Sequence, residues 1–324
     1  MTTTEHDFAK ARRVLAKYLQ PTRLVRSQSL SEAHKQEVFL KLENELPTGS
    51  FKVRGAIYAL SANEARLATR EVVASSTGNH GAAVAYAAQL LGWRARIFLP
   101  EKCNPVKRQN IERLGAAIEE TGAIDLAAAF LAASEYALST GAFFLNDATD
   151  PDLPAGPGTI ALEILERQPD LDAIYVPMGD TALVRGVAAA AKNASSRVVI
   201  VGVQSERAPS YYLSWKAGRA IETENCDTIA DGLATRTPVE TNVQAIRKLV
   251  NEVVLVGEDE MLLSIGRLFK EEQIVAEPAG AAATAAYLKS GGKFGPRVAL
   301  LVSGGNISPE VAERAGIGGQ TTKP

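Results

Sequence analysis

The stretch Thr48-Gly-Ser-Phe-Lys-Val-Arg-Gly-Ala56 places one lysine, Lys52, between a predicted strand and a predicted helix. The run VFLKLE, residues 38–43, has the composition of a strand, and the apolar spacing after the lysine predicts a helix that Thr48 or Ser50 could cap. The positive end of that helix and the neighbouring ring of Phe51 should both disfavour the ammonium form of Lys52. Because a neutral amine can attack a carbonyl carbon, Lys52 is a candidate nucleophile, although a solvated lysine on a first helical turn has the same local pattern.

Composition places the chain among ordinary globular proteins. Its 324 residues are 46% hydrophobic and 22% charged, enough for a large core and two domains. A net charge of -2 gives no basic field for nucleic acid, and no apolar run reaches the length of a membrane span. The two cysteines, Cys103 and Cys226, lie too far apart for a zinc pattern, and the charged N-terminus lacks the apolar centre of a signal peptide. We therefore expect a cytoplasmic protein with a small-molecule partner, no nucleic acid, no membrane and no bound metal.

Short β-rich runs alternate with alanine-rich helical runs along most of the chain. This alternation predicts an α/β fold with mainly parallel sheets covered by helices. The strand-like runs are VVAS (72–75), ARIFL (95–99), AIYVP (173–177), RVVIVGV (197–203) and RVALLVS (297–303). We expect residues 70–148 to form a small domain and residues 1–69 with 149–324 to form a large one.

Three loops that follow predicted strands carry chemistry. Ser75-Ser-Thr-Gly-Asn-His-Gly81 brings hydroxyls and backbone N–H groups to a helix start, which makes a site for a carboxylate, or simply a capped helix. Met178-Gly-Asp-Thr-Ala-Leu183 offers amides to a phosphate, although Asp180 would repel one unless its side chain pointed outward. Ser303-Gly-Gly-Asn306 lets a flat ring approach the backbone and offers a neutral hydroxyl.

Lys52 and these loops should meet, because ligands of open parallel sheets bind beyond the carboxyl ends of the strands. One lysine, two anion sites and a hydroxyl for a ring nitrogen match an amino acid bound to pyridoxal phosphate.

The chain resembles the fold type II pyridoxal-phosphate enzymes of the serine/threonine dehydratase and serine racemase group. The matching strings, in the family's order, are GSFKVRGA, SSTGNHG, GPGTIALEI, TIADGLA, EPAGAA and VSGGN. The resemblance implies two open three-layer αβα domains of the tryptophan synthase β-subunit-like type, pyridoxal 5'-phosphate as the cofactor and a homodimer.

The resemblance also implies roles for single residues. Lys52 resembles the lysine that forms a Schiff base with the cofactor, with Phe51 beside the ring. Asn79 resembles the partner of the phenolic oxygen, and Ser303, followed by Gly304, that of the pyridine nitrogen. The substrate carboxylate is expected at Ser76, Thr77, Gly78 and His80, and the cofactor phosphate at Gly179, Asp180, Thr181, Ala182 and Leu183.

The sequence departs from the family pattern at three places. The phosphate loop is GDTAL where the family usually has a run of glycines. Thr77 stands where racemases of the group carry a serine, which favours elimination over racemisation. Positions of the group's divalent-metal site look like Gln204 and Ser210, which predicts a weak or absent metal site.

The implied reaction is β-elimination, the dehydration and deamination of a β-hydroxy amino acid such as L-threonine or L-serine to a 2-keto acid and ammonia. Lys52 would act as the general base. The alternatives are a racemase or β-replacement enzyme, a dehydratase for another hydroxylated amino acid (3-hydroxyaspartate, phenylserine or a hydroxyectoine-breakdown product), and a protein that holds the cofactor without turnover.

Overall fold

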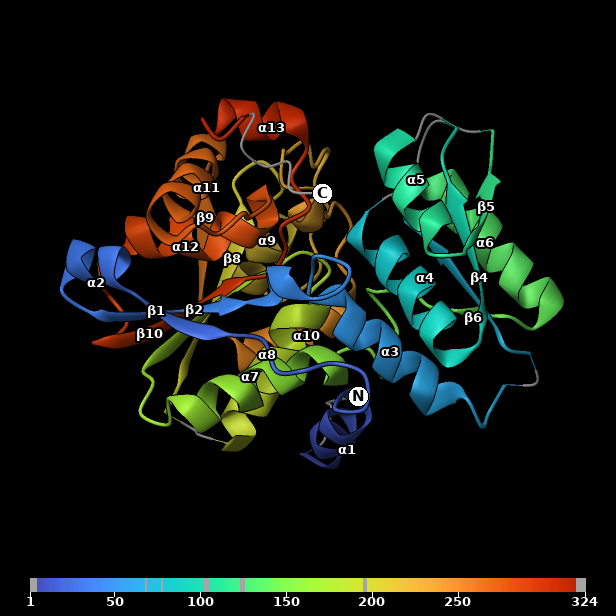
Figure 1. Ribbon diagram of the computed structural model, residues 1–324, viewed down its shortest axis with the longest axis horizontal. Coiled ribbons are helices and arrows are strands. Elements are labelled where there is room, and N and C mark those ends of the chain that lie inside the picture. Colours follow the sequence, from blue (N-terminus) through green and yellow to red (C-terminus); the bar gives the residue numbers. More distant parts are fainter. Residues whose placement is uncertain are drawn as a thin grey trace.

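Two parallel sheets organise the chain in the computed structural model. The structure describes residues 5–67, 69–76, 78–101, 105–122, 126–194 and 197–318. Figure 1 shows the larger sheet on the left, the smaller one on the right, and helix α3 (Lys52–Asn63) between them. The α/β fold expected from the sequence is confirmed.

The larger sheet has six strands in the order β1-β2-β10-β7-β8-β9. All its pairs are parallel except β1 with β2, which closes one edge as an antiparallel pair. The strands are β1 (Leu24–Ser27), β2 (Glu37–Leu42), β7 (Ala173–Pro177), β8 (Val199–Ser205), β9 (Glu252–Val256) and β10 (Arg297–Val302).

Alternate side chains of these strands enter two cores, as strands buried on both faces require. Along β10, Val298 and Leu300 face one core, while Ala299 and Leu301 face the other. One core is covered by α1 (Glu5–Leu15), α7 (Ala155–Arg167), α8 (Ala182–Ala194), α9 (Ser210–Ala217) and α10 (Glu240–Leu249). The other is covered by α2 (Gln28–His34), α11 (Glu258–Glu272), α12 (Pro278–Ser290) and α13 (Pro309–Arg314).

The smaller sheet is parallel throughout, in the order β5-β4-β3-β6. Its strands are β3 (Glu71–Ser75), β4 (Arg94–Leu99), β5 (Ala117–Glu120) and the short β6 (Phe143–Phe144). Helices α4 (Asn79–Leu91) and α5 (Pro105–Arg113) cover one face with α3, and α6 (Leu126–Thr140) covers the other. The three-layer arrangement implied by the resemblance is therefore present in both sheets.

Each predicted strand is present, although some ends differ, and the strands β1, β5, β6 and β9 were not predicted. AIYVP coincides with β7, whereas the run predicted at 197–203 is a strand only from Val199 and continues to Ser205. The predicted helix cap is wrong: α3 begins at Lys52 with Phe51 as its N-cap residue, and no side chain caps it. Among the described residues, the Thr48 and Ser50 hydroxyls have no hydrogen-bond partner although both are buried.

A buried cluster of charges holds α3 against the larger sheet. Arg54, 1% exposed, donates to Glu43 on the short helix η1 (Glu43–Glu45), with Nε at 2.7 Å from Oε2. It also donates to Glu163 on α7, with Nη1 at 2.6 Å from Oε1, and buried Lys41 of β2 contacts the same Glu163. Burial alone would lower the pKa of Arg54, but the two carboxylates outweigh it and raise that pKa. The cluster ties the residue two positions after Lys52 to β2 and α7.

Replacing Arg54 should destabilise the protein strongly. In Arg54→Leu, the fully buried Glu43 loses its guanidinium partner, so we expect the free energy of unfolding of the apoprotein in urea to fall by about 3–5 kcal/mol. The matched control is Arg12→Ala, because the Arg12–Glu166 pair is about half exposed and should contribute only about 0–1 kcal/mol. Equal losses in the two variants would contradict a structural role for the buried cluster.

Candidate active site

Lys52 is fixed in place by backbone hydrogen bonds between two loops that follow neighbouring strands. Ser50 and Gly304 form an isolated antiparallel bridge, and the Phe51 N–H donates to the Ser303 carbonyl at 3.0 Å. The Gly305 N–H donates to the Gly49 carbonyl at 2.9 Å. Because β2 and β10 pair in parallel, their carboxyl ends lie side by side, and these bonds place Lys52 next to Ser303.

Gly49 is required at this junction. Its φ is +69°, and a Cβ there would come within 3.0 Å of Asn306 Cγ and closer still to the amide oxygen. The Asn306 side chain needs that space because its Nδ2 donates to the Thr48 carbonyl at 2.9 Å and to Asn79 Oδ1 at 2.7 Å. Asn306 thus joins the Lys52 loop to the start of α4 on the smaller sheet.

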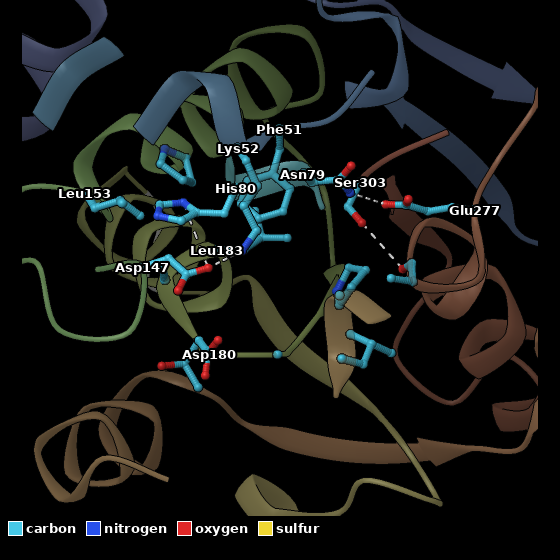
Figure 2. Close-up of a pocket in the computed structure, with 18 residues that line it drawn as sticks. Phe51, Lys52, Asn79, His80, Asp147, Leu153, Asp180, Leu183, Glu277 and Ser303 are labelled. Atoms are coloured by element: carbon cyan, nitrogen blue, oxygen red, sulfur yellow. Dashed lines mark hydrogen bonds and ion pairs between the residues drawn. The ribbon is translucent and has the colours of Figure 1, made fainter. Parts of the chain in front are cut away.

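A cavity lies at this meeting point, with about 600 Å³ of empty space that includes its opening to solvent. Figure 2 shows the side chains that line it, with Lys52, Asn79 and Ser303 entering from three different segments. Of the predicted residues, those lining the cavity are Phe51, Lys52, Asn79, His80, Gly179, Asp180, Thr181, Ala182, Leu183 and Ser303.

Four predicted residues are not described as lining the cavity. Gly304 forms the bridge with Ser50 instead. The Ser76 hydroxyl accepts a hydrogen bond from the Gly78 N–H at 3.2 Å, so these two shape the loop before α4. Thr77 lies outside the described residues.

The two positions that resemble the divalent-metal site of the group, Gln204 and Ser210, are both buried. Gln204 accepts a hydrogen bond from the Tyr212 N–H, and the Ser210 hydroxyl donates to the Thr235 carbonyl.

The cavity also holds residues to which the sequence patterns assigned no role. They are Asp147, Leu153, Pro157, Pro177, Gly232, Leu233, Glu277 and Ala279. Gly232, Glu277 and Ala279 belong to the motifs TIADGLA and EPAGAA, which carried the resemblance without a residue role. Asp147 comes shortly after β6, a strand of two residues that leaves no periodic signal.

Lys52 is an ammonium paired with Asp147, contrary to the expectation of a neutral amine. Its Nζ contacts Asp147 Oδ2, and both side chains are about one-fifth exposed. Burial would lower the pKa of Lys52, but the negative charge of Asp147 outweighs it and raises the pKa above the ordinary value. A carboxylate in direct contact affects the pKa of Lys52 more than the helix end and Phe51 do.

Asn79 and Ser303 line the same cavity as this ion pair. Asn79 Nδ2 donates to Glu277 Oε1 at 2.7 Å, which orients its amide. Ser303, 4% exposed, has only a long contact from its hydroxyl to the Ala279 carbonyl at 3.4 Å. A hydroxyl with so weak a partner can rotate toward a ring nitrogen in the cavity.

The loop before α8 forms the third side of the cavity. Thr181, the residue before this helix, has a φ of +70°, which is rare for a β-branched side chain. Its Oγ1 accepts a hydrogen bond from Arg185 Nε at 3.1 Å, and its carbonyl accepts from the Arg185 N–H at 2.8 Å. Helix geometry leaves the N–H groups of Ala182 and Leu183 without acceptors inside the helix, which is the donor set that a phosphate requires.

Asp180 lines the cavity, as expected of a residue of the phosphate loop. Its Oδ1 accepts a hydrogen bond from Thr235 Oγ1 at 3.1 Å. Burial, with a smaller contribution from the charge of Asp147, raises the pKa of Asp180 to about 6. This carboxyl is therefore neutral below about pH 6 and charged above it.

These residues fit pyridoxal phosphate. An amine for its aldehyde, a weakly engaged hydroxyl for its ring nitrogen and a helix start for its phosphate face one cavity. Gly179 lies where the loop touches Gly232, and a Cβ there would collide with the Gly232 carbonyl. Asp180 belongs to this same loop, and in its charged form it would oppose a phosphate there.

Comparisons with known proteins agree with the geometry. Residues 15–304 match the family model described as "Pyridoxal-phosphate dependent enzyme". The chain is 39% identical over 311 residues to an L-threonine ammonia-lyase of Thermotoga maritima, covering 96% of this chain and 77% of that protein. It is 34% identical to the catabolic L-threonine dehydratase TdcB of Escherichia coli K12, covering 93% and 92%.

Solved structures give the same result. Maize serine racemase superposes with a TM-score of 0.91 at 27% identity, covering 97% of each chain. A threonine deaminase of T.th. superposes with a TM-score of 0.88 at 33% identity, covering 94% of this chain and 99% of the other. The chain belongs to the pyridoxal-phosphate dependent enzymes, in their fold type II group, and pyridoxal phosphate is its cofactor.

Among the residues that the structure describes, no helix is long and apolar enough to span a membrane.

Proposed function

We propose that the enzyme is an ammonia-lyase that removes water from a β-hydroxy amino acid such as L-threonine or L-serine, giving a 2-keto acid and ammonia. The observation that carries the proposal is that Lys52 and Ser303 line one cavity, with their loops joined by backbone hydrogen bonds. The neutral Ser303 hydroxyl would leave a cofactor ring nitrogen beside it unprotonated, which favours β-elimination. Relatives named threonine ammonia-lyase and threonine dehydratase support the reaction type.

Each side of the cavity has a task in this proposal. Lys52 would hold the cofactor through its amine and would accept the proton from the substrate Cα. When bound, pyridoxal phosphate supplies the electron-withdrawing group that makes this proton acidic. Asn79 would hold the phenolic oxygen, Phe51 would pack beside the ring, and residues 179–183 would hold the phosphate.

The substrate carboxylate is assigned to the loop before α4. By their sequence, Ser76, Thr77 and Gly78 would supply hydroxyl and amide donors before α4, as anion sites do. His80 sits at the wall of the cavity with its Nε2 2.8 Å from the Leu145 carbonyl, so it shapes the site by holding that backbone.

We further propose that residues 70–148 act as the small domain and residues 1–69 with 149–324 as the large domain. The four-stranded sheet lies within the first range, and α3 packs between the two sheets. Movement of the small domain would exclude water during the proton transfers. A homodimer in the cytoplasm, with a weak or absent divalent-metal site, completes the proposal.

Racemisation is the second candidate, favoured by the overall likeness to maize serine racemase. A racemase needs a proton donor on each face of the substrate. Racemases of the group carry a serine at the position where this chain has Thr77. The products separate the two reactions, since elimination releases a 2-keto acid and racemisation conserves the amino acid.

A substrate panel tests the reaction. We expect keto acid from L-threonine or L-serine, or from another member of a panel that includes 3-hydroxyaspartate and phenylserine, at a rate well above that of D-isomer formation. Keto acid is measured by coupled reduction and the enantiomers by chiral chromatography. Stereochemical inversion of serine without keto-acid release would contradict the proposal.

Loss of the lysine should remove the spectral signature of the bound cofactor. With Lys52→Ala, we expect the visible absorption band of the holoenzyme to disappear or shift, because no amine remains at that place for the aldehyde. Lys192→Ala, on the exposed side of α8, is the control and should keep the wild-type spectrum. An unchanged spectrum in Lys52→Ala would contradict the assignment of Lys52 as the lysine that binds the cofactor.

Cofactor affinity should depend on the charge of Asp180. We expect the ratio of the wild-type to the Asp180→Asn dissociation constant for pyridoxal phosphate to rise by roughly tenfold as the pH increases through about 6, because only the wild type gains a negative charge near the phosphate. Taking the ratio cancels the titration of Lys52 and of the phosphate to first order.

Asp150 provides the matched control for Asp180. Burial raises its pKa to about 6 as well, but it accepts backbone hydrogen bonds from Asp152 and Leu153 and does not line the cavity. Asp150→Asn should therefore keep the wild-type pH dependence. If the ratio of the wild-type to the Asp180→Asn dissociation constant stays the same from about pH 5 to about pH 8, the result contradicts the placement of the cofactor phosphate at residues 179–183.

A further inference from the structure

Asp147 reaches the reacting nitrogen from a loop that has no task in the sequence patterns or in the proposed function. It lies between β6 and α7, and its Oδ2 contacts Lys52 Nζ directly. Figure 2 shows Lys52 and His80 both directed toward this carboxylate. Of the described residues that line the cavity, Lys52 is the only lysine or arginine.

The charges around this pair leave Asp147 as the direct partner of Lys52. Asp180, on the loop before α8, adds a second negative charge to that of Asp147 when it is ionised. Glu277, before α12, accepts a hydrogen bond from Asn79. Arg185 of α8 is turned elsewhere: its Nη2 donates to the Ala148 carbonyl at 3.2 Å and its Nε donates to Thr181.

His80 of α4 does not compete for the carboxylate. Its Nε2 lies 2.8 Å from the Leu145 carbonyl, which can only accept, so Nε2 carries the hydrogen. Burial lowers the pKa of His80, so the ring is neutral and its Nδ1, 4.0 Å from Asp147 Oδ2, bears a lone pair. Nδ1 therefore donates nothing to Asp147, whose charge is left for Lys52.

We propose that Asp147 is the counter-ion of Lys52 during the reaction, a positioning residue that strengthens this amine as the base for the substrate Cα proton. The inference rests on the proposed function for the identity of that proton. In the step concerned, the Cα–H bond breaks, an N–H bond forms on Lys52 Nζ, and the electron pair stays on the substrate. Asp147 gains no proton, and its charge stabilises the ammonium that forms.

The holoenzyme without substrate gives the first test, through the pH dependence of its visible absorption. In Asp147→Asn, we expect the midpoint of the absorption change to move to lower pH, because an amide no longer favours the protonated form of the Lys52 nitrogen. Asp152→Asn is the matched control, since Asp152 lies on the same loop, accepts from Asn63 and does not line the cavity. It should keep the wild-type midpoint.

Turnover gives the second test. For the hydroxy amino acid that the enzyme uses, we expect kcat of Asp147→Asn to fall roughly ten- to hundredfold with little change in KM, because the base is weakened and not removed. The isotope effect of a Cα-deuterated substrate on kcat should increase, since proton abstraction becomes slower. Asp147→Glu should recover part of both quantities.

An unchanged absorption midpoint in Asp147→Asn, or an equal shift in Asp152→Asn, would overturn the proposal. Should Asp147→Asn fail to retain cofactor, the rate at which acetic anhydride labels Lys52 in the apoprotein decides the matter. We expect faster labelling at neutral pH than in the wild type, and an equal rate would overturn the proposal.

The two hypotheses fail separately. The absorption titration and the labelling need no turnover, so they decide the role of Asp147 even if no hydroxy amino acid proves to be a substrate. A wild type that releases no keto acid contradicts the proposed function alone.

Discussion

The short backbone bridge between residues 49–51 and 303–305 is the constraint on which the rest of the site depends. It holds the start of α3 against the loop that follows β10, so that the lysine and the serine hydroxyl face one cavity. Two further contacts stabilise it, the Asn306 side chain on one side and the buried Arg54 cluster on the other. The bridge forms because β2 and β10 are parallel neighbours whose carboxyl ends coincide.

That same edge explains why much of the site could be predicted from the sequence. Lys52, Asn79, Ser303 and residues 179–183 all follow strands with clear β-rich patterns, and parallel strands bring such loops together. Asp147 follows a strand too short to leave a pattern, and Glu277 precedes a helix without a strand before it. The β-rich patterns therefore gave no indication of either acid.

The charge state of Lys52 could not be predicted from local sequence for a related reason. The helix end and Phe51 are neighbours in the chain, whereas Asp147 lies 95 residues away and comes into contact only through the fold. A direct carboxylate contact in a partly buried site outweighs a helix dipole. The central strands of the larger sheet, β2, β7, β8 and β10, were more predictable, because they are almost fully buried and read as apolar runs.

The described residues that line the cavity include one ammonium and three carboxyl groups. Each carboxyl group has a different partner. Asp147 pairs with Lys52, Glu277 orients Asn79, and Asp180 is held by Thr235 with a pKa raised to about 6. In our proposal the cofactor phosphate enters this environment and is attracted by the amides at the start of α8. The GDTAL loop thus replaces the glycine run of the family pattern with one strained threonine and one titrating acid.

The central claim is that Lys52 is the amine that joins the cofactor. Borohydride reduction of the holoenzyme, followed by digestion and mass spectrometry, tests it most directly. The account predicts a single phosphopyridoxyl-lysine in the peptide that contains Lys52. Labelling of any other lysine, with Lys52 unmodified, would contradict it.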